Sequence, residues 1–223
     1  MMRRLIQRTG YWAVVAALVA VVPVGMARAD TIFTDLGSGG TFTGTGGYVL
    51  GGANDDGDTL AMPFQVGAAA DLAAAILALG SFGGRNDAIQ VYLESDSSSG
   101  LPGTVLATLT QQGTIPPTNA PTLVTFYCNA GCPLLSSGAS YWLVAVTDSS
   151  SPDVWFLSNS DRGTFALNPS YSASGPWDTE SGTLSAFKVD GTPAAVPEPS
   201  SLVLLGIALC GFAVVGRRLR LTI

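Results

Sequence analysis

Residues 88–94 read Ala88-Ile89-Gln90-Val91-Tyr92-Leu93-Glu94, a stretch in which apolar Ile89, Val91 and Leu93 alternate with Gln90, Tyr92 and Glu94. Successive side chains of a β-strand point to opposite faces, so this alternation predicts a strand with one buried face. Residues 96–103 follow as a turn rich in Ser, Gly, Asp and Pro. A strand that ends in such a turn is typical of an antiparallel β-protein.

Other segments repeat this arrangement of strand and turn. The strand segments are 59–66, 104–109, 122–127, 140–146, 154–157 and 184–189, and further turns lie at 116–119 and 148–153. Residues 67–79 are rich in alanine and suit a helix by propensity, but we assign residues 72–79 to a strand because strand signals flank them. The sequence therefore predicts an all-β fold, an antiparallel β-sandwich with jelly-roll-like connections, over residues 30–195.

Composition excludes several functions. Only 12% of the 223 residues are charged, and the chain has no histidine. Ser-His-Asp catalysis, Cys-His catalysis and histidine metal sites are therefore excluded. Residues 30–195 carry 15 acidic residues against Arg85, Arg162 and Lys188. A domain with this negative charge repels phosphate backbones, so we expect no nucleic-acid partner.

The N-terminus has the parts of a secretory signal peptide. A basic segment comes first and contains Arg3, Arg4 and Arg8. An apolar run follows at residues 11–22, and Ala27 and Ala29 supply small side chains at the two positions that a signal peptidase reads. We expect residues 1–29 to be removed by cleavage after Ala29. The alternative is an uncleaved membrane anchor, for which the apolar run is short.

The C-terminus is a second segment outside the predicted domain. Val196-Pro197-Glu198-Pro199 precedes an apolar run at residues 202–215, and a basic cluster of Arg217, Arg218 and Arg220 comes next. About 15 helical residues span about 22 Å, less than a hydrocarbon core of about 30 Å, and the arginines can reach the interface to offset some of the deficit. Basic residues at both chain ends favour the cytoplasmic side, so the two ends predict that the residues between them are translocated.

These C-terminal elements, in this order over residues 196–223, resemble the PEP-CTERM sorting signal. The resemblance implies that exosortase, a multi-pass membrane enzyme with a cysteine nucleophile, removes the helix near the Pro-Glu-Pro motif. The protein would then pass from the inner membrane to the cell surface or the medium of a Gram-negative bacterium that makes exopolysaccharide. The alternative is an ordinary C-terminal anchor that contains Pro-Glu-Pro by chance.

Residues 45–190 are similar, more weakly, to the choice-of-anchor R type of bacterial surface domain. The similarity rests on an Asp-Gly-Asp turn before residues 64–66, then on residues 91–93, 100–107, 140–144 and 154–156. Members of that family end in varying anchor signals, and no catalytic residues are defined for it. The similarity therefore implies a surface domain and supplies no site.

Two groups of residues suggest a disulfide and a metal site. Cys128 and Cys132 enclose a small turn, and an oxidising compartment favours a disulfide between them. A metal site or a redox pair is the alternative, but no further ligands complete the first and the spacing fits the second poorly. Asp55, Asp56 and Asp58 form an acidic turn that can hold calcium or remain solvated. No other cofactor is expected.

Carboxylates and aromatic residues supply the remaining candidates. Glu94 and Asp96 can form a carboxylate pair at a strand end, but chance adjacency is the preferred explanation of their spacing. Trp142 and Trp155 lie inside strand patterns and are expected in the core. Trp177, near Tyr171, lies in a loop and is the candidate for stacking on a sugar ring, with packing as the default.

Two functions from different classes follow. The first is an exported, non-catalytic surface or matrix protein that is sorted by exosortase and associated with exopolysaccharide or biofilm. The second is a secreted carboxylate-dependent glycoside hydrolase or a carbohydrate-binding module. The lack of histidine and of a recognisable acid pair favours the first.

Overall fold

A computed structural model describes residues 28–51, 58–82, 89–147, 152–169, 172–173 and 176–194. The predicted signal peptide up to residue 27 and the tail from residue 195 lie outside these ranges. The described part is all-β and antiparallel, as predicted, and contains no helix. In these ranges, accordingly, no helix has the length and apolar character needed to cross a membrane.

Twelve strands make up the described part and pair into one continuous sheet. They are β1 (Asp30–Thr34), β2 (Gly47–Leu50), β3 (Thr59–Gln65), β4 (Ala70–Ser81), β5 (Ile89–Asp96), β6 (Pro102–Gln112), β7 (Thr122–Tyr127), β8 (Leu134–Leu135), β9 (Ser140–Thr147), β10 (Asp153–Asn168), β11 (Asp178–Ser185) and β12 (Phe187–Pro193).

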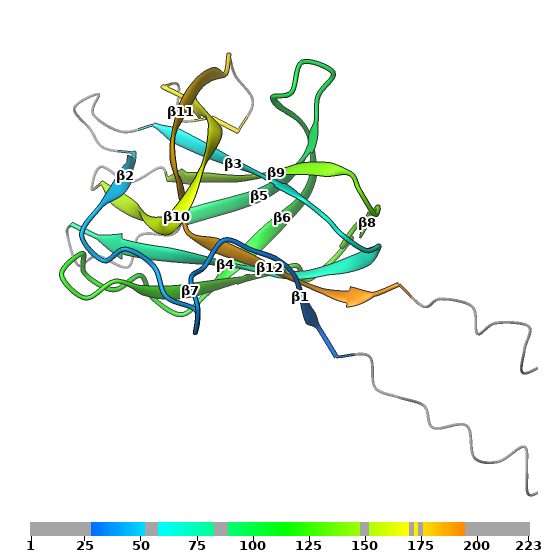
Figure 1. Cartoon of the computed structure of the whole chain (residues 1–223), viewed down its shortest axis with the longest axis horizontal. Coiled ribbons are helices and arrows are strands. Elements are labelled where there is room, and N and C mark those ends of the chain that lie inside the picture. Colours follow the sequence, from blue (N-terminus) through cyan, green and yellow to red (C-terminus); the bar gives the residue numbers. More distant parts are fainter. Residues whose placement is uncertain are drawn as a thin grey trace, which may run out of the picture.

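The sheet closes on itself because its longest strand has partners on both sides of the fold. The order β4-β7-β6-β5-β9-β3-β10 returns to β4 through pairs between Asp153–Trp155 and Leu79–Ser81. The first part of β10 also pairs with β2, and its last part pairs with β3 and β11. Figure 1 shows the resulting two layers, with β3, β9 and β5 on one side and β4, β12 and β7 on the other.

The main core fills the space between the layers, and smaller clusters lie on the outer faces. Along β9, Leu143 and Ala145 point into the main core, whereas Trp142, Val144 and Val146 belong to a cluster on the opposite face. In the same way Ala78 of β4 belongs to an outer cluster that Leu36 and Phe42 help to cover. Strands covered on both faces read as continuous apolar runs. This explains why the strand at residues 72–79 lacks clear alternation.

Two sequence-based boundaries need correction. Residues 184–189, predicted as one strand, are the end of β11 and the start of β12, because the chain crosses between layers at Ala186. The N–H of Ala186 donates to the carbonyl of Phe156 at 2.7 Å, and its carbonyl accepts the Nε1–H of Trp155 at 2.9 Å. The strand predicted at 154–157 continues to Asn168, past an irregularity between Leu157 and Arg162.

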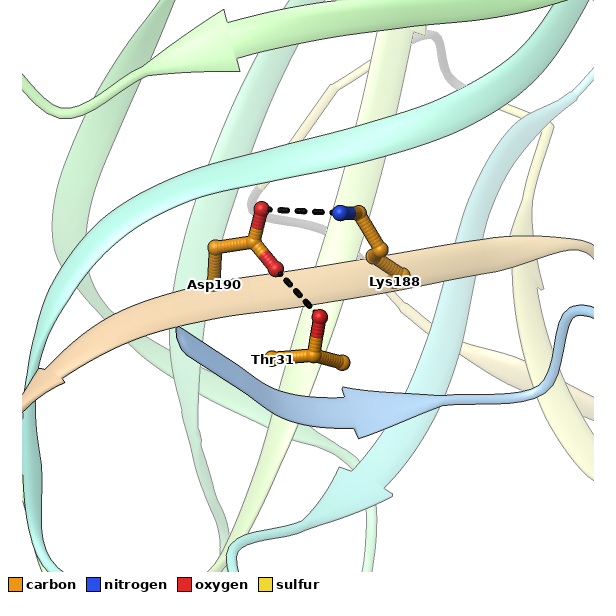
Figure 2. Close-up of polar contacts among 3 residues, drawn as sticks. All are labelled: Thr31, Lys188 and Asp190. Atoms are coloured by element: carbon orange, nitrogen blue, oxygen red, sulfur yellow. Dashed lines mark hydrogen bonds and ion pairs between the residues drawn. The ribbon is translucent and has the colours of Figure 1, made fainter. Parts of the chain in front are cut away.

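The first and last strands of the domain are paired, and we call this pairing the terminal clasp. β12 lies between β1 and β4, and Asp30 at the start of β1 is opposite Gly191 near the end of β12. The Thr31 hydroxyl donates to Asp190 Oδ1 at 2.9 Å, and Lys188 Nζ lies 3.0 Å from Asp190 Oδ2 (Figure 2). Both ends of the domain therefore leave it at the same edge (Figure 1).

Apolar packing beneath the clasp fixes β12 against the core. Phe187, which is 0% exposed, lies with its ring 5.0 Å from Phe33 of β1, 6.0 Å from Phe64 of β3 and 5.9 Å from Trp155 of β10. Ring contacts at these distances stabilise the fold beyond what the burial of apolar surface alone contributes. One side chain of the last strand thus holds together three other strands.

We expect Phe187→Ala to lower the free energy of unfolding by about 3–5 kcal/mol, because it leaves a cavity among packed aromatic rings. Urea unfolding followed by tryptophan fluorescence measures the change. The matched control is Phe82→Ala, since Phe82 is 60% exposed and should change stability by less than about 0.5 kcal/mol. Equal effects of the two substitutions would contradict the role given to Phe187.

Candidate functional site

A groove opens where two neighbouring strands separate. β3 pairs with β10 only from Thr59 to Ala61, but β3 continues to Gln65 along β9. From Arg162 onward β10 pairs with β11 on its other side. The groove between them has a volume of about 500 Å³ and is lined by Phe33, Pro63, Phe64, Gln65, Ser140, Asp161, Arg162 and Leu184.

The lining divides into an apolar part and a polar part. Phe33, Pro63, Phe64 and Leu184 supply apolar surface, and Phe64 is buried beneath it. Pro63 has no N–H, and a proline in a strand weakens a hydrogen-bond ladder at its position. This is a local reason why β3 and β10 do not remain paired along the whole of β3.

Four polar side chains from β3, β9 and β10 line the same groove. Gln65 of β3 is oriented by the bond from its Nε2 to the carbonyl of Gly138 at 2.9 Å. Asp161 and Arg162 come from the irregular part of β10, where the Asp161 N–H donates to Ser158 Oγ at 2.9 Å. Ser140 begins β9. Donors and acceptors therefore lie on both sides of the apolar surface.

Asp35, which the sequence did not single out, lies buried near this groove. Its Oδ1 accepts the N–H of Phe187 at 2.6 Å, and its Oδ2 has no hydrogen-bond partner in the described part of the chain. Burial raises the pKa of Asp35 to about 7; the bond from Phe187 opposes the rise and the negative charge of Asp161 adds to it. Asp35 thus connects the terminal clasp electrostatically to the groove.

The predicted carboxylate pair does not form a pair that faces solvent. Glu94 is 0% exposed, and neither of its carboxyl oxygens has a hydrogen-bond partner among the described residues. It lies opposite Trp142 on β9, whose Nε1–H donates to Asp96 at 2.7 Å. Burial raises the pKa of Glu94 to about 7. Asp96 is exposed, so the two carboxyls lie in different environments.

The tryptophans lie where packing would place them. Trp142 and Trp155 are buried, as predicted. Trp177 is half-buried and packs, with Ala173 and Leu101, over the outer cluster that contains Trp142. Trp177 therefore covers a face of the sheet and does not stand free in solvent. Tyr171 lies outside the described residues.

The structure describes both cysteines of the predicted disulfide but only one residue, Asp58, of the predicted calcium site. Cys128 and Cys132 are joined as a disulfide, with their Cα atoms 5.7 Å apart. Asp55 and Asp56 lie outside the described residues. Burial, followed by the charges of Glu180 and Asp178, raises the pKa of Asp58. No cluster of three metal-ligating side chains occurs in the described ranges, so calcium binding by the acidic turn stays a prediction.

Comparison with known proteins identifies the tail. Residues 195–219 match the PEP-CTERM protein-sorting motif. The tail of the chain therefore carries a protein-sorting motif. The motif implies an exported protein with a C-terminal membrane-anchored intermediate and a membrane-associated processing partner. The match does not extend to residues 45–190 and gives no support to their similarity to choice-of-anchor R domains. Searches of curated proteins and of solved structures returned no match.

The two buried carboxyls predict that stability falls as the pH rises. Asp35 and Glu94 have ordinary pKa values of 3.8 and 4.5, and both are raised to about 7 in the fold. The folded protein therefore binds protons more tightly than the unfolded chain, and this stabilisation is lost between about pH 4.5 and pH 7. We expect the urea midpoint to be higher at pH 5 than at pH 8.

Glu94→Gln should remove part of this pH dependence, because the amide keeps the shape of the side chain without the charge. We compare the free energy of unfolding of the variant with that of the unmodified protein. The difference should favour the variant more at pH 8 than at pH 5, by on the order of 1 kcal/mol. The control is Glu180→Gln, since Glu180 is exposed. An unchanged difference between the two pH values in Glu94→Gln would show that Glu94 is not a buried acid.

Proposed function

We propose that this chain is an exported, non-catalytic cell-surface or matrix protein. Residues 1–29 direct export, residues 30–195 form a sandwich-like surface domain with a jelly-roll-like arrangement, and residues 196–223 are processed by exosortase. The observation that carries the proposal is the match of residues 195–219 to the PEP-CTERM motif. The final location is the cell surface or the medium of a Gram-negative bacterium.

The terminal clasp supports processing at both ends of the domain. β1 begins at Asp30, directly after the expected cleavage at Ala29, and β12 ends at Pro193, shortly before Pro197. All twelve described strands lie between the two expected cleavage points in the sequence. Cleavage at both ends would therefore retain each of these strands.

The lack of catalysis is supported by the position of the acids. Glu94 has no solvent-exposed surface, so a polysaccharide cannot reach it in this conformation. The chain also has no histidine that could act as a general base. A glycoside hydrolase typically uses two accessible carboxyls at a set separation. We therefore favour a surface or matrix role, associated with exopolysaccharide, over a glycoside hydrolase.

Glu198→Ala, or loss of Pro197, should leave membrane insertion intact but block processing. The apolar run and the arginines would still hold the tail in the inner membrane. We expect the full-length chain to accumulate in the membrane fraction at higher mass, as seen by immunoblot and mass spectrometry. Glu180→Ala, the same substitution on the surface of the domain, should be processed like the unmodified protein.

Deletion of Arg217, Arg218 and Arg220 should act differently, because it weakens the stop-transfer anchor and leaves the motif intact. If the Glu198→Ala protein is processed and released like the unmodified protein, the tail is a plain anchor and the proposed sorting is wrong.

A further inference from the structure

We propose that the groove between β3 and β10 binds a neutral polysaccharide chain, held by hydrogen bonds to sugar hydroxyls above an apolar floor. This rests on the proposed function as a surface protein, and it assigns the contact to residues that sequence reasoning did not select. The groove is lined by Phe33, Pro63, Phe64, Gln65, Ser140, Asp161, Arg162 and Leu184.

The polar groups of the groove suit vicinal hydroxyls, each of which donates one hydrogen bond and accepts others. Arg162 supplies a planar set of donors and Asp161 supplies acceptors, while Gln65 and Ser140 each offer both kinds of group. Gln65 and Ser140 lie opposite each other on β3 and β9, whereas Asp161 and Arg162 come from β10. A chain lying along the groove would therefore contact polar groups from both sides.

The apolar residues suit the C–H surface of a sugar ring. Phe33, Pro63 and Leu184 are half-buried, so part of each side chain reaches the groove surface. Binding sites typically combine such apolar surface with a few polar groups that fix orientation. Phe33 belongs to β1, so the floor is complete only when β1 has paired with β12.

An extended peptide fits this groove less well than a sugar chain. Among the described residues, 62–65 of β3 have no strand partner on the side of β10, and such an edge can accept an added strand. However, Pro63 lies in the middle of these residues and lacks the N–H that a ladder needs. Side-chain recognition is therefore favoured over main-chain pairing.

Charge decides between a neutral and an acidic polymer. Residues 30–195 hold 15 acidic residues and only three basic ones. Asp161 lies in the groove itself, and the negative charge of Asp161 acts on Asp35 nearby. A polyanion would be repelled by this field even though Arg162 offers one cationic contact. The groove therefore selects uncharged chains.

Affinity gel electrophoresis of the exported protein, purified in mild detergent whether or not its tail has been processed, tests the proposal. Gels contain dextran, laminarin or galactomannan as neutral polymers and alginate as an acidic one. We expect at least one neutral polymer to retard the protein and alginate not to retard it. Arg162→Ala and Gln65→Ala should each weaken the retardation about tenfold, as expected for one lost hydrogen-bonding side chain.

The controls separate binding from folding and from catalysis. Gln112→Ala removes an exposed glutamine from β6, away from the groove lining, and should bind like the unmodified protein. Each variant is first shown to have the unmodified urea midpoint. The polysaccharide that retards the protein should gain no new reducing ends, because the groove binds the polysaccharide without cleaving it.

Several results would overturn the proposal. These are no retardation by any of the three neutral polymers, equal retardation of Arg162→Ala and the unmodified protein, or stronger retardation by alginate. Chemical-shift changes at residues 62–65 caused by a Thr-Val repeat peptide, without any caused by the sugars, would assign the groove to peptide addition. None of these results depends on processing of the tail, which the Glu198→Ala experiment tests separately.

Discussion

The antiparallel pairing of β1 with β12 is the contact on which the rest of the structure depends. β12 fills the place between β1 and β4 and buries Phe187 among Phe33, Phe64 and Trp155. The two strands are separated by almost the whole length of the domain, so bringing them together costs loop-closure entropy. β1 can therefore pair, and Phe187 can be buried, only when the final strand of the domain is present.

This order of closure suits a chain that is exported from its N-terminus. The partner of β1 is the last strand of the domain, so β1 has no partner while the intervening residues cross the membrane. The expected cleavage site at Ala29 lies directly before β1 and would remain extended and accessible during that time. Because β12 ends at Pro193, shortly before Pro197, the clasp and the sorting motif are close together in the sequence.

The sequence predicts most strands but not the places where the chain changes partner. Alternation located β5, where apolar Ile89, Val91 and Leu93 are buried, whereas no glycine or proline marks the crossing at Ala186. Glu94 was predicted as a possible member of a carboxylate pair, but its burial depends on the neighbouring strand β9, where Trp142 lies opposite it. The burial of Asp35 and the formation of the groove both depend on strand pairing across the whole domain. The pattern of neighbouring residues in the sequence does not reveal such pairing. The tail motif, by contrast, is a continuous segment and was predicted from its residues alone.

The terminal clasp can be measured directly with a pair of cysteines. Thr31→Cys with Asp190→Cys places thiols on residues that are opposite each other and in side-chain contact. We predict that an unreduced digest of the exported protein yields a disulfide-linked pair of peptides from β1 and β12, detected by mass spectrometry. Thr31→Cys with Thr125→Cys is the control, because β4 lies between β12 and β7. Free thiols in the first variant, or equal cross-linking in both, would contradict the clasp.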